Sequence, residues 1–152
     1  MQITRAGEYA ILGLSYLARQ PAGRMVMIDE ISEAEAIPKS FLAKIFQSLV
    51  RGGFVRSHRG ARGGFSLEKP AEQINLLEIL NRVEGAFALQ KCVTNHPSCV
   101  VTASRLRSCP LCAVFNEAQS RVNEVLSGTS LADLLKSGLD AAPPARVPAS
   151  SS

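Results

Sequence analysis

The 152-residue chain has no tryptophan, and aromatic residues make up only 5% of it. Proteins that bind single-stranded nucleic acids stack the bases on exposed aromatic rings, so this composition argues against that mode of binding. Long apolar runs are also missing, since a run such as residues 10–12 is too short to cross a bilayer. The first residues lack the apolar core of a signal peptide. We therefore expect a cytoplasmic protein that does not enter a membrane and whose thiols stay reduced.

Motifs that are typical of enzymes are scarce as well. The chain has two histidines, His58 and His96, and shows neither a paired-carboxylate motif nor a phosphate-binding loop. A small redox or metal-handling enzyme needs an activated nucleophile, or an open metal position beside a general acid or base. We therefore expect a protein that is not an enzyme, and a small redox or metal-handling enzyme is the more distant alternative.

Positive charge is concentrated in one stretch of the chain. The net charge is +4, yet residues 39–69 contain seven Lys and Arg residues against Glu68 alone, a balance of +6. Residues 71–152 carry seven charges of each sign and are neutral overall. A basic stretch can be an ordinary solvated surface, but its concentration in about thirty residues favours a surface that binds phosphate.

Periodicity predicts an N-terminal half of three helices followed by a β-hairpin. Helices are predicted at residues 4–20, 29–36 and 38–51, with Thr4 as the first N-cap and Pro38 at the start of the third helix. Apolar residues of the third helix at 41, 42, 45, 46, 49 and 50 are expected to form one buried stripe. Short strands are predicted at 54–57 and 65–67, joined by a basic, glycine-rich turn at 58–64.

This order of elements is that of a winged helix–turn–helix, in which the third helix enters the major groove and the hairpin is the wing. Arginines on a glycine-rich wing tip suit a narrow minor groove, whereas a surface hairpin with incidental charge is the alternative interpretation. Polar and basic side chains on the third helix can contact base edges or phosphates. The candidate DNA-binding residues are Lys39, Ser40, Lys44, Gln47, Arg56, Ser57, Arg59, Gly60 and Arg62.

The C-terminal half has a different organisation. Asn75 and Glu78 resemble a capping box at the start of a helix over 75–85, and a long helix is predicted at 110–126 with a short one from Ser130. The apolar stripe of the long helix either packs on its own domain or forms a twofold dimer interface, which would match palindromic DNA. The sequence thus predicts a mainly α fold with a small β-hairpin. Its regions are a winged helix–turn–helix domain at 1–85, a cysteine-rich loop at 86–109, a dimerisation helix with a final short helix at 110–137, and a disordered tail at 138–152.

Four cysteines lie close together, namely Cys92, Cys99, Cys109 and Cys112. Structural zinc sites usually combine two short Cys-x2–4-Cys knuckles, and only the last pair has that spacing. The wide spacing of the others favours an iron–sulfur cluster over zinc, and zinc over a redox disulfide. Cys109 precedes a helix, where the helix dipole favours a thiolate. His96 is a weak candidate ligand, and an exposed loop residue is its simpler interpretation.

Several stretches resemble a known bacterial family. They include Tyr9–Ala10 with Leu14, Ile37–Pro38, the run from Ser57 to Leu67, and Ile74–Gly85. The run from Ser57 to Leu67 is the most specific of these. Over about residues 1–136 the chain resembles the IscR/NsrR/RirA/CymR-type family of bacterial winged-helix transcriptional regulators.

The resemblance implies a homodimer that binds double-stranded promoter DNA and senses its signal through an iron–sulfur cluster. Cys92, Cys99 and Cys109 match the three cysteines of the cluster-binding members. Cys112 stands where IscR-like members place a histidine, and Glu8 stands where NsrR-like members use an acidic residue from the partner's first helix. The nine residues between Cys99 and Cys109 form a longer gap than in IscR-like members, so a [2Fe–2S] and a [4Fe–4S] cluster both stay open.

The expected function is therefore sequence-specific transcriptional regulation, as a repressor that responds to redox state, nitric oxide or iron and cluster status. A regulator of the same fold that senses oxidants through its thiols, or that binds zinc, is the closer alternative.

Overall fold

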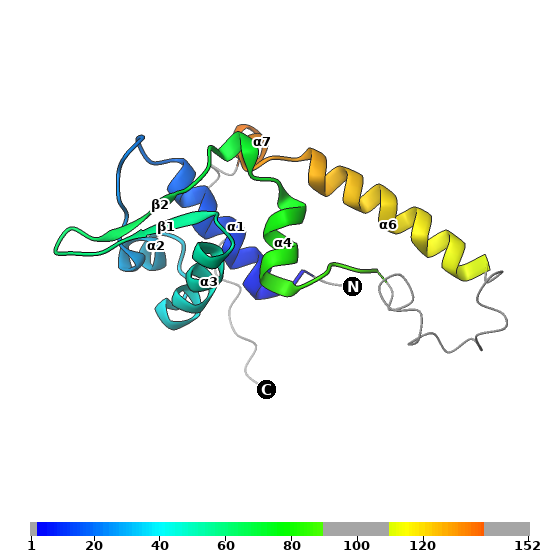
Figure 1. Cartoon of the computed structure of the whole chain (residues 1–152), viewed down its shortest axis with the longest axis horizontal. Coiled ribbons are helices and arrows are strands. Elements are labelled where there is room, and N and C mark those ends of the chain that lie inside the picture. Colours follow the sequence, from blue (N-terminus) through cyan, green and yellow to red (C-terminus); the bar gives the residue numbers. More distant parts are fainter. Residues whose placement is uncertain (1–2, 90–109, 139–152) are drawn as a thin grey trace.

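The computed structural model describes residues 3–89 and 110–138, and within them the order of elements follows the predicted pattern. The elements are α1 (Arg5–Ala18), α2 (Ile28–Ala34), α3 (Lys39–Arg51), β1 (Val55–His58), β2 (Gly64–Leu67), a 3-10 turn η1 (Ala71–Gln73), α4 (Leu76–Glu84), α6 (Pro110–Gly128) and α7 (Leu131–Lys136). The predicted mainly helical fold with one two-stranded hairpin is confirmed. Figure 1 shows α1–α4 and the hairpin gathered into one body, from which α6 extends as a long arm.

The core of this body is built around α1 and α3. Leu14 of α1 and Leu42, Phe46 and Leu49 of α3 are fully buried. Each such side chain stabilises the fold by about 1.5–3 kcal/mol, whereas an exposed ion pair contributes about 0–1 kcal/mol. Apolar burial therefore fixes the position of α3. The two helices approach closely at Gly13, where a Cβ atom would lie 2.7 Å from Cε2 of the Phe46 ring.

The predicted buried stripe on α3 is wrong at Phe41, and Val50 at the end of the stripe is only half-buried. Phe41 is 56% exposed, and its ring meets the Tyr9 ring edge-on with the ring centroids 6.5 Å apart. The stripe covers more of the helix circumference than the core can reach, so the residue at its edge stays in contact with solvent.

The hairpin is fixed to α3 through its second strand. β1 and β2 pair in antiparallel register with Ser57 opposite Phe65. Val26, in the segment before α2, forms a further bridge to Phe65, with N–O distances of 2.9 and 2.8 Å. The Phe65 ring packs edge-on against Phe46 at a centroid distance of 5.0 Å. Backbone pairing and ring packing therefore hold the hairpin beside α3.

Side-chain caps begin several of the helices. The Thr4 hydroxyl accepts a hydrogen bond from the Gly7 N–H, as expected of an N-cap. At α4 the structure shows the Asn75 half of the expected capping box, in which the Asn75 side chain accepts from the Glu78 N–H at 2.9 Å. A full capping box stands instead at α7, where Ser130 and Asp133 each bond the backbone N–H of the other.

After α6 the chain returns to the body. Leu76 N donates to Thr129 O at 3.1 Å, and Leu131 N donates to Ile74 O at 2.7 Å. Leu131 and Ile74 are both fully buried, so α7 contributes to the same core as α1 and α3. The described part of α6 is different, because Leu111, Val114 and Val125 expose 59–67% of their surface.

Candidate DNA-binding surface

The outward face of α3 presents a continuous polar row. Ser40, Lys44, Gln47 and Arg51 are spaced i, i+4, i+7 and i+11, so they lie along the side of the helix opposite the buried leucines. All four are exposed. Lys39 is exposed beside this row, and its ammonium forms an ion pair with Asp29 of α2. Arg51 is not among the residues that the sequence predicts to bind DNA, although its i+4 spacing from Gln47 is a signal that could have identified it.

A groove of about 650 Å³ joins α3 to the hairpin. Gln47, Val50 and Arg51 line it from α3, and Ser57, Arg59 and Phe65 line it from the hairpin. Residues predicted separately on the helix and on the wing therefore share one continuous surface.

The hairpin turns its two faces in different directions. Ser57 lies on the same face as Phe65 and points toward the groove, whereas Arg56 lies on the opposite face because side chains alternate along a strand. Arg56 donates from Nε and Nη2 to the two carboxylate oxygens of Glu68, both at 2.6 Å. These hydrogen bonds lower the pKa of Glu68 below its usual value and raise the pKa of Arg56. Much of the Arg56 charge is thus offset within the hairpin itself.

The tip of the wing carries Arg59, Gly60 and Arg62, and all three are exposed. Gly60 has a φ of +117°, a conformation that side chains rarely adopt, and its carbonyl accepts from Gly63 N at 2.9 Å. Within residues 3–89 and 110–138, neither arginine of the tip has a carboxylate partner, and the same holds for Lys44 and Arg51. The uncompensated charges therefore lie on the α3 row and the wing tip.

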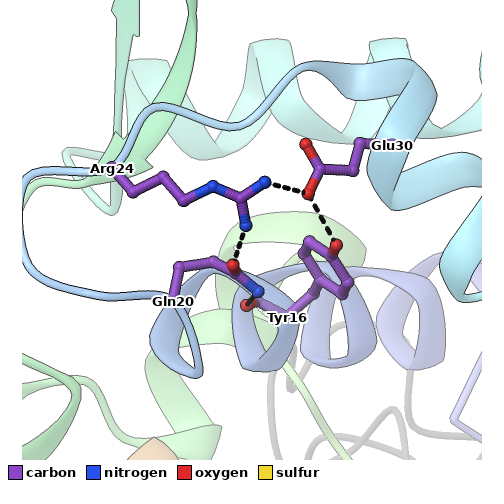
Figure 2. Close-up of polar contacts among 4 residues, drawn as sticks. All are labelled: Tyr16, Gln20, Arg24 and Glu30. Atoms are coloured by element: carbon purple, nitrogen blue, oxygen red, sulfur yellow. Dashed lines mark hydrogen bonds and ion pairs between the residues drawn. The ribbon is translucent and has the colours of Figure 1, made fainter.

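A polar network sets the position of α2, the helix before α3 (Figure 2). Oε1 of Glu30 accepts from the Tyr16 hydroxyl at 2.8 Å and from Arg24 Nη2 at 2.6 Å. Arg24 also contacts the Gln20 side chain, which in turn donates to the Tyr16 carbonyl at 3.1 Å. Partial burial, and then the neighbouring Glu30, raise the pKa of Tyr16. The network joins α1 to α2 across the segment in which Val26 pairs with the wing, a link that sequence periodicity could not predict.

Two of the predicted metal ligands fall in the described residues. Cys112 is half-buried in the first turn of α6, and Glu8 is exposed in the first turn of α1. Cys92, Cys99, Cys109 and His96 lie outside the described residues. Between residues 3 and 89 and between 110 and 138, no three His, Cys, Asp or Glu side chains form a group that could hold a metal ion. The ligand set stays a prediction from the sequence.

None of the described helices combines the length and the apolar character that a membrane span requires.

Sequence comparison finds relatives along most of the chain. A profile of the Rrf2 family, described as an iron-dependent transcriptional regulator, matches residues 3–137. A protein of Aquifex aeolicus named as an HTH-type transcriptional regulator is 32% identical over 128 residues, which cover 84% of this chain and 87% of the relative. Protein aau3 of Rhizobium meliloti is 33% identical over 136 residues, which cover 90% of this chain and 86% of the relative.

Solved structures share the fold. CymR, the global cysteine regulator of B. subtilis, superposes with a TM-score of 0.73 at 22% identity, covering 90% of this chain and 98% of CymR. IscR of T. potens superposes with a TM-score of 0.69 at 23% identity, covering 93% of this chain and 90% of IscR. These similarities confirm the predicted winged helix–turn–helix architecture.

Proposed function

The chain belongs to the Rrf2 family of DNA-binding transcriptional regulators, and from this premise we propose that it represses transcription by binding promoter DNA through α3 and the wing. We further propose that its cysteines hold an iron–sulfur cluster through which redox state, nitric oxide or iron and cluster status controls this binding. The proposal places the protein in the cytoplasm, where promoter DNA is accessible.

One observation carries the DNA-binding part of the proposal. The α3 row and the wing tip meet along one groove, and the charges there have no carboxylate partner in the part of the chain that the structure describes. Ser40, Lys44 and Gln47 have the side chains that contact base edges and phosphates in a major groove. Arg59 and Arg62 on a glycine turn suit the electronegative, narrow minor groove beside it. The proposed surface also includes Lys39, Arg56, Ser57 and Gly60. Arg56 has a lesser role, because its guanidinium is already paired with the carboxylate of Glu68.

The proposed molecule is a homodimer on palindromic DNA. Leu111, Val114 and Val125 of α6 are apolar yet mostly exposed in the single chain. An apolar helix face of this kind suits a second copy, and a twofold axis places two wings and two α3 helices on successive half-sites.

The donor chemistry of the cysteines fits an iron–sulfur cluster. Cys112 lies in the first turn of α6 and is half-buried, a position in which the helix N-terminus stabilises a thiolate. Cys92, Cys99 and Cys109 would supply three further thiolates, and Glu8 of the partner subunit competes with Cys112 as the fourth ligand. A bound [2Fe–2S] or [4Fe–4S] cluster would supply sensitivity to electrons, oxidants and nitric oxide.

The experiment is a visible absorption spectrum with iron and sulfide analysis on anaerobically purified protein, before and after nitric oxide. We expect a brown protein whose bands change with nitric oxide, and we expect Cys92→Ala to lose the chromophore. A colourless protein with one zinc per chain would overturn the cluster. Arg59→Ala should weaken promoter binding, while its absorption spectrum should be the same as that of the wild type.

A second candidate function follows from the spacing of Cys109 and Cys112. This Cys-x2-Cys pair also fits half of a zinc site or a thiol pair that oxidants convert to a disulfide. Such a regulator would contain no sulfide and no iron, and its DNA affinity would respond to thiol oxidation or to zinc chelation. The same iron and sulfide analysis distinguishes it from the cluster-binding regulator.

A further inference from the structure

The buried side chain on the described part of α6 is a polar one. Gln119 is only 5% exposed, while the apolar Leu111, Val114 and Val125 of the same helix are 59–67% exposed. Burial of an amide is unfavourable unless hydrogen bonds compensate for the lost water. The contacts of Gln119 therefore explain why α6 turns this residue inward.

Gln119 holds the chain segment that leads into the cysteines. Its Oε1 accepts from Leu89 N at 2.7 Å, and its Nε2 donates to Phe87 O at 3.2 Å. Nε2 also donates to Oδ1 of Asn123 at 2.8 Å. The side-chain amide thus pairs with the backbone of residues 87–89 as a neighbouring peptide group would. Leu89 stands three residues before Cys92 in the sequence.

Hydrogen bonds continue from this contact toward α3. Phe87 N donates to Oδ1 of Asn81 on α4 at 3.0 Å. The next residue of α4, Arg82, donates from Nε to the Ser48 carbonyl of α3 at 2.9 Å. Ser48 directly follows Gln47 of the α3 row. A continuous set of contacts therefore joins α6, the segment 87–89, α4 and the helix proposed to read DNA.

We propose that Gln119 is a positioning residue that fixes the start of the cysteine segment on α6 and thereby couples the state of the cysteines to α4 and α3. This inference rests on the proposed function, because it assigns a path for the regulation of the same DNA-binding surface. Two sites are coupled only when the binding of one changes the equilibrium of the other, so the quantity to measure is a ratio of DNA affinities.

The test compares Gln119→Met with the wild type. Methionine has nearly the same volume but cannot form these hydrogen bonds. The DNA is a fragment selected from random sequences by the wild-type protein. Its dissociation constant is measured with the thiols reduced and again after anaerobic cluster assembly, and the ratio of the two constants is the coupling. Gln73→Met is the matched control, because Gln73 is exposed on η1 and takes no part in the hydrogen bonds described above.

We expect the coupling ratio to move toward 1 by at least about threefold in Gln119→Met and to stay unchanged in Gln73→Met. Amide exchange at Leu89, measured on the reduced protein without any cluster, should accelerate on the order of tenfold in Gln119→Met. A role limited to stability would accelerate exchange throughout the body and leave the coupling ratio of the folded protein as it is.

A second variant keeps the inference testable if Gln119→Met folds poorly. Asn81→Ala changes an exposed residue and removes the acceptor of the Phe87 N–H, so it should also lower the coupling. An unchanged ratio in both variants, or unchanged exchange at Leu89 in Gln119→Met, overturns the inference. If the wild type assembles no cluster, the cluster proposal fails separately, and the same ratio is measured between reduced and iodoacetamide-alkylated protein.

Discussion

Arg56 and Glu68 are joined across the hairpin by two hydrogen bonds of 2.6 Å, so a carboxylate lies beside one of the arginines predicted to bind DNA. This pairing orders the base of the wing and also reduces its positive potential. The arginines of the tip, Arg59 and Arg62, keep their full charge. The surface with unpaired positive charge is therefore smaller than the +6 balance of residues 39–69 indicated.

Glu68→Gln should strengthen DNA binding several-fold at low salt. The change removes a negative charge and releases Arg56 for a phosphate, which should steepen the dependence of log K on log salt by about 0.9 per added phosphate contact. Fluorescence anisotropy over a series of salt concentrations measures both quantities. Glu72→Gln is the control for net charge, because Glu72 is also an exposed acidic residue but lies on η1. Equal effects of the two variants would show that the Arg56 pair has no particular role.

Arg51→Ala should weaken binding to specific and unrelated DNA by similar factors. Arg51 ends the α3 row and lines the groove, a place suited to a phosphate rather than a base. Losing one phosphate contact lowers the salt slope by about 1. Competition with random DNA distinguishes a phosphate contact from a base contact. If Arg51 contacted a base, Arg51→Ala would lower specificity as well as affinity.

Gly13→Ala should destabilise the protein by up to about 2 kcal/mol. The new Cβ would lie 2.7 Å from the Phe46 ring, and overpacking of this kind costs about 1–3 kcal/mol. Higher helix propensity offsets about 1 kcal/mol of that cost. Gly128→Ala is the matched control, since nothing lies within 4 Å of a Cβ there, and it should be neutral or stabilising. Urea unfolding followed by circular dichroism gives both values, and a stabilised Gly13→Ala would contradict the close packing of α1 and α3.

Tyr16→Phe should lower the free energy of unfolding by about 1 kcal/mol at neutral pH, because Glu30 loses a hydrogen-bond donor. The pKa of Tyr16 is raised above 10.0, so the folded state favours the neutral phenol. The advantage of tyrosine over phenylalanine is therefore fully present below pH 10 and falls as the pH rises through the raised pKa. Paired urea titrations of the two proteins between pH 7 and pH 11 follow this difference. A constant difference over that range would contradict the predicted linkage.

Val125→Asp should convert the proposed dimer into monomers without unfolding the chain. Val125 is 67% exposed and lines a shallow apolar hollow on α6 with Val122 and Leu126. Its substitution should therefore change the stability of the single chain only slightly. Sedimentation velocity measures the association, and thermal unfolding checks the fold. Ser120→Asp adds the same charge on another side of α6 and should leave the dimer intact. A dimer that survives Val125→Asp would place the interface elsewhere.

Sequence periodicity predicted the elements of the body because burial follows the helix and strand repeats closely. Leu42, Phe46 and Leu49 recur at helical spacing, and the glycine-rich turn marks the hairpin. Periodicity failed at Phe41 because it counts apolar residues without knowing how wide a face the core covers.

The polar contacts between elements left no such pattern in the sequence. Glu30 and Tyr16 are fourteen residues apart, and Gln119 and Leu89 are thirty apart. Nothing in the local sequence distinguishes Gln119 from an exposed glutamine, because its burial depends on where residues 87–89 cross α6. The nine DNA-binding candidates are all exposed on α3 or on the hairpin, and their contacts with DNA stay predictions.

The place of α7 in the core determines how far synthesis must proceed before the body can fold completely. Leu131 is fully buried against the body, and it pairs through its backbone with Ile74. A nascent chain that has reached only residue 85 lacks this side chain and leaves the apolar surface around Ile74 in water. The core of the body that carries α3 and the wing is therefore completed only after the four cysteines have been translated. Every molecule whose core has closed behind α3 therefore already contains the segment that carries the cysteines.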